Sequence, residues 1–468
     1  MINFSETSQK GKIREILNKK GAKIYFIGIG GVSMSSLAIL MKKRGMKVSG
    51  SDIRTSEITD ILKTEGIGVR LSHAKESVMA FGADIVVYSL AVDRENPEYR
   101  AAMEIGALTV SRAELLGAVM EDFKTKLGIS GSHGKSTVSA FMGSVLDQLQ
   151  LNPTVLCGAE ISSLYGLKEG TYDYLVYEAC EYGDSFLKLE ADVQILLNLE
   201  LDHTDYFKTL NDIKASFLRC ANNAKRSCVL NFDCANLRDI SNKITKPIHT
   251  FSKRDGAEYK YDIVKRGKAM YSFKLFRKTE FIGEYFPAIR GEFNVQNAVA
   301  VAVTADVLGM PSDLVAKAIS SFKGIKRRLE LIKQTKDFDV FYDYAHHPSE
   351  IAASYSALSE MGYQNITVIF APHTYTRTAS FFDSFAKELA KFNTVYISEI
   401  YGAREKAMVG VNSTALASAV SQYRKEAHAV CANESLKVVS AIKTGGSDCV
   451  VLMGAGELYK YKEEFMKM

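Results

Sequence analysis

The feature that most constrains the fold is a repeated alternation of short β-rich runs with amphipathic, helix-like stretches. Between Lys23 and Asp122 the β-rich runs include KIYFIGIG, KVSGSD and IVVYSLAV, and stretches such as SMSSLAILMKKRG separate them. Alternation of this kind predicts βαβ units and a mostly parallel sheet. The pattern starts again at KLGIS and, after Leu329, at VFYDYA. We therefore predict an α/β protein.

Length and two breaks in this pattern predict three domains. A chain of 468 residues fits two to four domains of ordinary size. The sequence becomes charged around 121–126, and 322–328 resembles a second linker. We place a Rossmann-like N-terminal domain at 1–123, a P-loop domain with a mostly parallel, ATPase-like sheet at 124–325, and a Rossmann-like C-terminal domain at 326–468.

Composition argues against several classes of protein. The net charge of +5 is small for this length, which argues against nucleic-acid binding. The seven cysteines have irregular spacings without a C-x-x-C pair, which fits a reducing compartment. We find neither a secretory signal in 1–23 nor an apolar run of about 18 residues that could span a membrane. These observations predict a cytoplasmic protein without membrane insertion.

A glycine-rich loop, GSHGKST at 131–137, follows the strand-like KLGIS and opens a helix-like stretch. Glycines allow backbone N–H groups to converge on a phosphate, and a helix N-terminus favours an anion. Lys135 would then meet the outer phosphates of a nucleotide. The loop departs from the G-x-x-x-x-G-K-[ST] spacing, because Ile129 stands where the first glycine belongs. A plain turn with a solvated lysine is therefore the alternative.

Two further strand ends carry groups suited to a metal–nucleotide site. The run YLVYE ends at Glu178, and ILLNLE leads into Asp202 and His203. Because ligands of open parallel sheets gather at the carboxyl ends of strands, we expect Glu178 and His203 to lie with the loop on one rim. Nucleotide-bound Mg²⁺ takes a loop hydroxyl and a carboxylate, which nominates Ser136 and Glu178. A lone histidine such as His203 is more often structural, and imidazole is an unusual magnesium ligand.

The N-terminal turn GIGGVSM, at 28–34, lies between a strand and a helix, and Asp52 ends the next strand. This arrangement is typical of dinucleotide-binding folds. Ser33 occupies the third glycine position of G-x-G-x-x-G, so the fingerprint is incomplete. The turn therefore indicates either a diphosphate-bearing ligand other than NAD or a purely structural tight turn, and an NAD-dependent dehydrogenase has little else to support it.

Polar residues also cluster at strand ends in the C-terminal third. The clusters are Asp343 with His346 and His347, His373 with Arg377, and Arg404 with Glu405 and Lys406. Guanidinium groups suit carboxylates and phosphates. Three clusters on one presumed sheet therefore predict a binding rim for an anionic or zwitterionic substrate.

Taken together, these motifs resemble those of the Mur ligases. The segments GSHGKST, EACEYGDSF, NLELDHTDYF, GEFNVQNAVA, KRRLE, DYAHHPSE, APHTYTRT, YGAREK and MGAGELY follow one another in the family's order over essentially the whole chain. The chain is most similar to the branch that joins L-alanine to UDP-N-acetylmuramate in peptidoglycan synthesis. The resemblance implies ATP-dependent amide-bond formation through an acyl phosphate, with Mg²⁺ as cofactor and small molecules as partners of a monomer or weak homodimer.

The resemblance also implies roles for individual residues. It places ATP on Gly131, Ser132, His133, Gly134, Lys135, Ser136, Thr137, Asn294, Asn297, Arg327 and Asp343, and Mg²⁺ on Ser136, Glu178 and His203. It assigns the UDP-sugar to Gly28, Gly30, Gly31, Met34 and His73, and the incoming alanine to His346, His347, His373, Arg377 and Arg404. The residues that it implies for catalysis are Lys135, Glu178, His203, His346 and Arg377.

Departures from the family pattern and two alternatives accompany the resemblance. Ser132 and Ser136 stand where threonines are usual, Phe293 replaces a common histidine, and Tyr342 replaces an acidic residue. Phe217 stands where several Mur ligases carry a carbamylated lysine. The absence of that lysine agrees with the alanine-adding branch. The alternatives are the branch that attaches a whole tripeptide to the same sugar, against which HTYTRT argues, and a nonenzymatic nucleotide-binding regulator.

Overall fold

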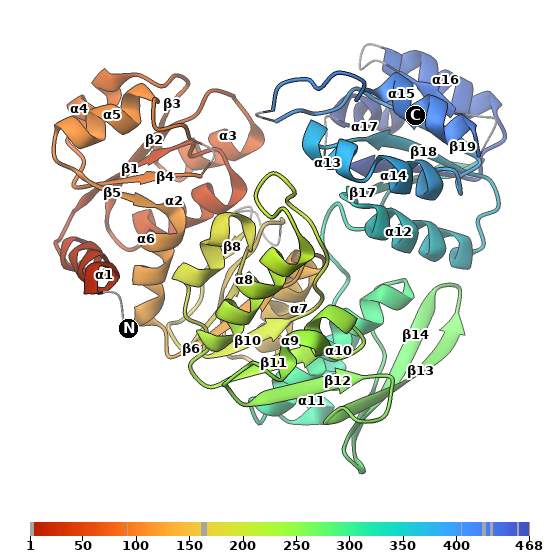
Figure 1. Ribbon diagram of the computed structural model, residues 1–468, viewed down its shortest axis with the longest axis horizontal. Helices are drawn as coiled ribbons and strands as arrows, with labels where there is room; N and C mark the ends of the chain where they lie inside the picture. Colours follow the sequence, from red (N-terminus) through yellow and green to blue (C-terminus); the bar gives the residue numbers. More distant parts are fainter. Residues whose placement is uncertain are drawn as a thin grey trace. The chain divides into compact units, whose positions relative to one another are not determined.

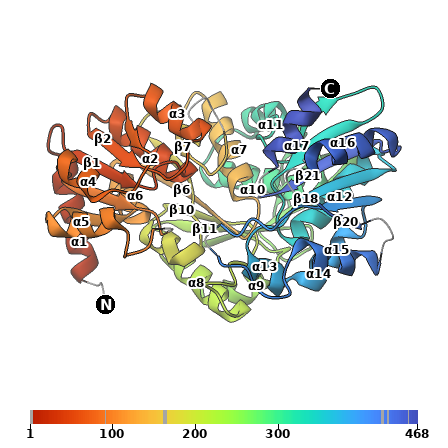
Figure 2. The ribbon, with the colours of Figure 1, turned by 90° about the horizontal axis from the view of Figure 1, so that it is seen from above.

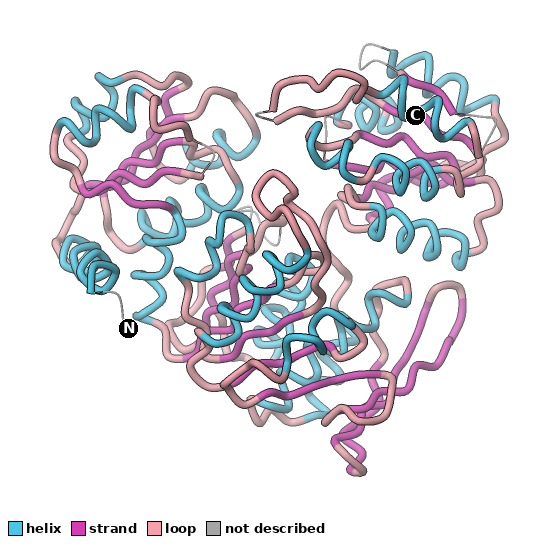
Figure 3. Tube along the Cα trace, viewed as in Figure 1, coloured by secondary structure: helices cyan, strands magenta, loops and turns pink. Residues whose placement is uncertain are grey.

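The structure is a computed structural model of the chain, and it describes residues 4–90, 92–160, 166–403, 405–423, 427–430, 434–455 and 458–467. Helices and strands alternate along most of the chain (Figure 1, Figure 3). The chain forms two compact units. The first comprises Met1–Leu199, Ile213–Ser252 and Val303–Met310, and the second comprises Glu200–Asp212, Lys253–Ala302 and Pro311–Met468.

A five-stranded parallel sheet forms the N-terminal part of the first unit. Its strand order is β3-β2-β1-β4-β5, from β1 (Lys23–Ile27), β2 (Lys47–Ser51), β3 (Gly68–Arg70), β4 (Ile85–Tyr88) and β5 (Leu108–Ser111). The helices are α1 (Phe4–Leu17), α2 (Val32–Lys43), α3 (Glu57–Thr64), α4 (Lys75–Phe81), α5 (Pro97–Glu104) and α6 (Arg112–Val119). The strand order reverses between β1 and β4, which is where ligands bind in open sheets of this kind.

Apolar burial and helix caps explain the elements of this sheet. Helices α4 and α5 lie side by side on one face (Figure 1), where Val78 and Ala101 pack with Tyr25 and Ile27. Helix α6 begins at a capping box, in which Ser111 and Glu114 each accept a hydrogen bond from the backbone N–H of the other. The sequence pattern of β-rich runs and amphipathic stretches thus predicts these elements for physical reasons, although helix α1 was not among the predicted helices.

The remainder of the first unit is built on a second sheet, with strand order β12-β11-β10-β6-β9-β7-β8. Its central strands β6, β10 and β11 run side by side and parallel (Figure 2). Only β7 and β8 pair antiparallel among the described pairs of this sheet. The strands are β6 (Thr125–Ser130), β7 (Thr154–Leu156), β8 (Leu167–Lys168), β9 (Tyr174–Glu178), β10 (Val193–Leu196), β11 (Ser227–Asn231) and β12 (Ile248–Ser252). The helices are η1 (Met120–Asp122), α7 (Lys135–Gln148), η2 (Tyr182–Lys188), α8 (Leu210–Asn222) and α9 (Ala235–Ser241).

The second unit combines an antiparallel meander with a mostly parallel sheet. The meander is β13 (Tyr259–Gly267), β14 (Met270–Arg277) and β15 (Glu280–Tyr285), where the sequence predicted a hairpin-like region, and it is followed by α10 (Glu292–Val307) and α11 (Ser312–Ser321). The sheet has the order β16-β17-β21-β18-β19-β20, and only β16 pairs antiparallel among its described strands. These strands are β16 (Glu330–Gln334), β17 (Asp339–Asp343), β18 (Ile366–Ala371), β19 (Thr394–Ile397), β20 (Ala427–Ala429) and β21 (Cys449–Gly454).

Helices cover both faces of this last sheet. Their bounds are α12 (Pro348–Met361), α13 (Tyr375–Ser380), α14 (Phe382–Leu389), α15 (Ser413–Ser421), α16 (Ser435–Thr444) and α17 (Tyr459–Met466). One core joins Leu358, Phe385 and Leu416 to the sheet, and a second core joins Ile442 and Phe465 to the opposite face. Strands buried on both faces read as nearly continuous apolar runs, as in ITVIFA and CVVLMG.

The predicted α/β class with mostly parallel sheets is confirmed. The domain boundaries placed at residues 123 and 325 stay predictions. Within the described part of the chain, none of the helices combines the length and the apolar character that a membrane span needs.

Candidate functional site

The glycine-rich loop connects strand β6 to helix α7, as its sequence predicted. Gly131 has a φ of +154°, and Gly134 has a φ of +85° and caps α7. A Cβ atom on Gly131 would lie 3.0 Å from Cβ of Leu197. Glycine is therefore required at 131 by backbone conformation and by space. The turn directs the N-terminus of α7, with its unsatisfied N–H groups, toward the loop, which is the geometry that binds phosphate.

Asn198 holds the loop in shape. Its Oδ1 accepts a hydrogen bond from the backbone N–H of His133 (2.8 Å), and its Nδ2 donates to the carbonyl of the same residue (3.0 Å). The backbone N–H of Ser132 donates to the carbonyl of Asn198 (3.2 Å). Three hydrogen bonds thus join the loop to the end of strand β10, so that its conformation is fixed by the protein itself.

Lys135 begins helix α7 and is paired with a buried carboxylate. Its Nζ lies 3.0 Å from Oε1 of Glu181, which is fully buried, and also donates to the carbonyls of Gly131 and Ser132. Burial lowers the pKa of Lys135, but the charge of Glu181 outweighs it and the pKa lies above its usual value. The ammonium group is therefore charged at any physiological pH, as stabilisation of a phosphate requires.

Glu178 ends strand β9 beside the loop. It pairs in register with Ile129 of β6, the strand that leads into Gly131. Its Oε1 accepts a hydrogen bond from the backbone N–H of Gly158 (2.8 Å), and a Cβ at Gly158 would lie 2.9 Å from Oε2. The side chain of Ser136, in the first turn of α7, is largely buried. A hydroxyl and a carboxylate on adjacent loop and strand ends are hard oxygen donors, and this donor set fits Mg²⁺.

The N-terminal turn is held by the protein's own backbone and by one carboxylate. The N–H groups of Gly28 and Ile29 both donate to the carbonyl of Ser51 (2.9 Å each), and that of Gly30 donates to Oδ2 of Asp52 (2.9 Å). A Cβ on Gly30 would lie 2.8 Å from the same oxygen. Asp52, directly after the neighbouring strand β2, thus holds the turn after β1 in place.

The predicted UDP-sugar residues occupy different environments. Gly31 caps helix α2, and the side chain of Met34, one turn further on, is buried in the core. His73 follows strand β3, and its side chain keeps 21% of its surface exposed. Gly28 and Gly31 therefore lie on the turn after β1, whereas His73 follows β3, which is separated from β1 by β2.

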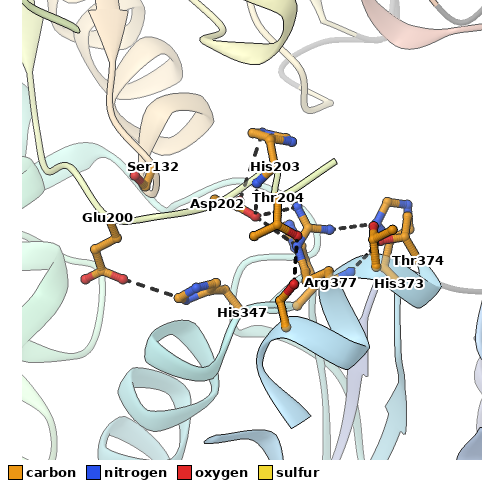
Figure 4. Close-up of polar contacts among 12 residues, drawn as sticks. Ser132, Glu200, Asp202, His203, Thr204, His347, His373, Thr374 and Arg377 are labelled. Carbon is orange, nitrogen blue, oxygen red and sulfur yellow. Dashed lines mark hydrogen bonds and ion pairs between the residues drawn. The ribbon is translucent and has the colours of Figure 1, made fainter. Parts of the chain in front are cut away.

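In the second unit, Asp202 and Arg377 form a buried ion pair that organises a cluster of histidines (Figure 4). Both Nε and Nη2 of Arg377 donate to Oδ1 of Asp202 (2.9 and 2.8 Å). Burial would raise the pKa of Asp202, but the charges of His203 and Arg377 lower it far below the usual range. The backbone N–H of His203, which has a φ of +52°, also donates to Asp202 (2.7 Å).

Two of the histidines are held neutral. Nη1 of Arg377 donates to Nδ1 of His373 (2.9 Å), so this nitrogen carries no proton. Burial is the main cause that lowers the pKa of His373 to about 3 and that of His346 to about 4. Nδ1 of His346 donates to the carbonyl of Tyr344 (2.9 Å). Both imidazoles are therefore uncharged at neutral pH.

His347 has a structural task at the start of helix α12. It caps the helix, and its Nδ1 lies 2.8 Å from Oγ of Ser349, which donates to Glu200 (3.0 Å). The same nitrogen lies 3.7 Å from the carboxylate of Glu200 (Figure 4). The cap and the hydrogen bond from Ser349 to Glu200 hold the imidazole in place relative to the segment that carries Asp202.

The residues predicted near the nucleoside contact one another in one case and other side chains or backbone groups of the second unit in the rest. Nδ2 of Asn297 donates to Oδ1 of Asn294 (3.0 Å), and the guanidinium of Arg327 lies 5.2 Å from the ring centre of Tyr344. Asp343 accepts hydrogen bonds from Ser354 and from the backbone of Ala345, and burial raises its pKa to about 6. 

The structure thus brings the predicted residues together in two groups. The loop, Lys135, Ser136 and Glu178 gather in the first unit, and His203, His346, His373 and Arg377 gather in the second. The predicted rim that joins the loop and Glu178 to His203 includes residues of both units, and it stays a prediction. Arg404 lies outside the described residues, and its neighbour Glu405 accepts hydrogen bonds from Thr376 at the start of helix α13.

Sequence reasoning missed two residues that shape the phosphate loop. Glu181 lies in the segment EACEYGDSF, in which the sequence predicts Glu178 as the functional residue, and Asn198 lies in the run ILLNLE, which leads into Asp202 and His203. A polar residue at the end of an apolar strand was the available signal for Asn198. Glu181 gives no comparable signal, because only the fold shows that it is buried against Lys135.

Comparison with known proteins decides the family. Residues 23–124 match the profile described as "Mur ligase family, catalytic domain", residues 129–305 match "Mur ligase middle domain", and residues 327–456 match "Mur ligase, glutamate ligase domain". The three matches follow one another over most of the chain. The chain belongs to the Mur ligase family. The glycine-rich loop at 131–137 lies within the match to the middle domain.

Full-length relatives are found among curated Mur ligases. The chain is 36% identical over 457 residues to the UDP-N-acetylmuramate–L-alanine ligase of Caldanaerobacter subterraneus subsp. tengcongensis. That alignment covers 97% of this chain and 99% of that protein. It is 35% identical over 449 residues to the ligase of the same name from Clostridium tetani, in an alignment that covers 95% of this chain and 98% of that protein.

Solved structures of Mur ligases have the same fold. The crystal structure of UDP-N-acetylmuramate-alanine ligase from Thermotoga maritima superimposes with a TM-score of 0.81 at 25% identity, and covers 95% of this chain and 98% of that one. A murein peptide ligase from Psychrobacter arcticus superimposes with a TM-score of 0.73 at 20% identity, and covers 96% of this chain and 98% of that one. The similarity to the murein peptide ligase shows only that the two proteins share a fold.

Proposed function

We propose that this Mur ligase joins L-alanine to the carboxylate of UDP-N-acetylmuramate at the expense of ATP, in the synthesis of peptidoglycan precursors. The observation that carries the proposal is the full-length similarity to curated UDP-N-acetylmuramate–L-alanine ligases. The geometry of the loop and of Lys135 supports it, because a charged lysine at the N-terminus of a helix suits the transfer of a phosphoryl group.

In the first step, an oxygen of the muramoyl carboxylate attacks the γ-phosphorus of ATP, and ADP leaves. Residues 131–137 hold the phosphates with backbone N–H groups, and Lys135 neutralises the charge that develops on the transferred group. Mg²⁺, when bound, supplies further charge neutralisation. Ser136 and Glu178 would hold one ion, and His203 would join Glu178 at a second. Catalysis on this scheme rests on positioning and electrostatics.

In the second step, the neutral amine of L-alanine attacks the acyl carbon and a tetrahedral intermediate forms. Inorganic phosphate then leaves, and the nitrogen gives up one proton to solvent and keeps the other as the amide N–H. We assign the orientation of the amino acid to the histidine cluster of the second unit. Neutral His346, whose Nδ1–H donates to Tyr344, can accept a hydrogen bond from an amine or ammonium group through Nε2. Neutral His373, whose Nδ1 accepts from Arg377, presents an Nε2–H that can donate to the carboxylate of the amino acid. Arg377 already serves Asp202 and His373, so its role is to hold the cluster in place.

The remaining assignments follow from the same proposal. The turn at 28–31 and His73 bind the UDP-sugar, and Asn294, Asn297, Arg327 and Asp343 lie near the adenosine. We further propose that the protein works in the cytoplasm on small molecules, as a monomer or weak homodimer.

The test is phosphate release from ATP with UDP-N-acetylmuramate and, in separate reactions, L-alanine, glycine, L-serine or the tripeptide L-alanyl-γ-D-glutamyl-diaminopimelate. We expect release that depends on both substrates and is fastest with L-alanine. Stimulation by the tripeptide alone would assign the chain to the recycling branch. Nucleotide binding without turnover on any amino acid would leave a nonenzymatic regulator.

A further inference from the structure

A buried carboxylate lies beneath the carboxyl ends of the N-terminal strands. Glu98, in the first turn of helix α5, is fully buried. Its Oε1 accepts a hydrogen bond from the phenol of Tyr25 on β1 (2.7 Å), and its Oε2 accepts one from the hydroxyl of Ser51 at the end of β2. Nδ1 of His73, which follows β3, lies 2.8 Å from the same Oε2. One carboxylate therefore ties three neighbouring strands together.

The chemistry of this network fixes the proton positions. A buried carboxylate needs hydrogen-bond donors, and the phenol of Tyr25 and the hydroxyl of Ser51 both donate to Glu98. Burial, together with the charge of Glu98, raises the pKa of Tyr25 well above its usual value, so the phenol stays a donor. The hydroxyl of Ser51 donates to Glu98, so it cannot also donate to Nδ1 of His73, 3.0 Å away.

It follows that Nδ1 of His73 carries a proton. An unprotonated Nδ1 would direct its lone pair at the carboxylate 2.8 Å away, whereas an Nδ1–H donates to it. The Nε2 atom of the imidazole is then the nitrogen that remains for a ligand. His73 keeps a fifth of its side chain exposed at the strand ends where open parallel sheets bind their ligands.

We propose that Glu98 is a positioning residue, which fixes the tautomer and orientation of His73 so that Nε2 meets a polar group of the nucleotide-sugar substrate. The inference rests on the proposed function for the identity of that substrate. In metal sites, a carboxylate that holds a ligand histidine has the same role, and its loss typically weakens metal binding or activity about 10- to 100-fold.

The test is a double-mutant cycle with Glu98→Gln, His73→Ala and the double variant, scored by the KM for UDP-N-acetylmuramate. We expect Glu98→Gln to raise this KM by about tenfold with little change in the KM for ATP. In the His73→Ala background the same substitution should have no further effect, because Glu98 acts through His73. Tyr25→Phe is the matched control, since it removes another donor to Glu98 without touching His73, and its KM should stay within about twofold of wild type.

Additive effects of Glu98→Gln and His73→Ala would overturn the proposal, since a purely structural carboxylate would act equally in both backgrounds. A second measurement is made on the wild-type protein and does not depend on folding of the Glu98 variants. The ¹⁵N shifts of His73 in the wild-type protein, assigned by comparison with His73→Ala, should report a protonated Nδ1, and an Nε2–H tautomer would also overturn it. If wild-type protein shows no turnover with this substrate, the proposed function fails, while the tautomer still tests the Glu98–His73 contact.

Discussion

At the scale of single residues, Lys135 is a cation that the fold keeps charged and aims at the phosphate loop. We expect Lys135→Ala to lower kcat by about 100- to 1000-fold, because it removes charge stabilisation from the transferred phosphoryl group. Lys124→Ala removes the same charge from a side chain that is 79% exposed, and it should leave kcat unchanged. Phosphate release gives the rates, and circular dichroism checks the fold. Substantial activity of Lys135→Ala would remove the residue from the mechanism.

Glu181 is the partner that makes the burial of Lys135 tolerable. Glu181→Gln keeps the volume but removes the negative charge beside a largely buried ammonium group, so we expect the free energy of unfolding to fall by about 1–3 kcal/mol. Glu190→Gln is the matched control, because Glu190 is 46% exposed and its contact with Lys225 should contribute less than about 1 kcal/mol. Urea denaturation of both variants measures the difference, and equal losses would show that the Lys135–Glu181 pair has no special weight.

At the scale of elements, the β6-loop-α7 unit depends on the backbone of Gly131. We expect Gly131→Ala to weaken ATP binding by at least about tenfold, because the new Cβ would press on Leu197 and strain a φ of +154°. Gly106 also has a positive φ, of +70°, but a Cβ there meets nothing within 4 Å. Gly106→Ala should therefore cost stability without changing the dissociation constant for ATP measured by calorimetry. Normal ATP affinity in Gly131→Ala would contradict the assigned role of the loop.

The helices and strands also show which features of the fold can be predicted from the sequence. Strand–helix alternation, apolar runs and the glycine loop predicted the parallel sheets and the position of Lys135 correctly, since these depend on local pattern. The roles of Glu181, Asn198 and Glu98 could not be predicted, because each is defined by a partner 46 to 73 positions away in the chain. Periodicity records which side chains are buried, but it does not record which buried polar groups meet.

At the scale of the whole molecule, ionisation in the second unit links its stability to pH. Buried His346 and His373 have pKa values of about 4 and 3, below the usual 6.5. Between the lowered pKa of each histidine and 6.5, the unfolded chain therefore binds more protons than the folded one. Their contribution to stability is therefore present above about pH 6.5 and is lost as the pH falls. Asp343 acts in the opposite sense, because its pKa is raised to about 6 and its contribution is lost as the pH rises through that value.

Acidification from pH 7 to pH 5 removes stability through His346 and His373 and adds stability through Asp343. Because two groups oppose one, the net effect is a loss of stability. We expect the protection of the β18 amides against hydrogen exchange, corrected for intrinsic exchange rates, to be lower at pH 5 than at pH 7. This measurement reports opening of the second unit and does not assume two-state unfolding of the whole chain. His346→Gln should reduce this pH dependence by about one proton, and Asp343→Asn should increase it, since it removes the opposing group. Because the two substitutions shift the slope in opposite directions, a common shift would show that the acid sensitivity arises elsewhere in the molecule.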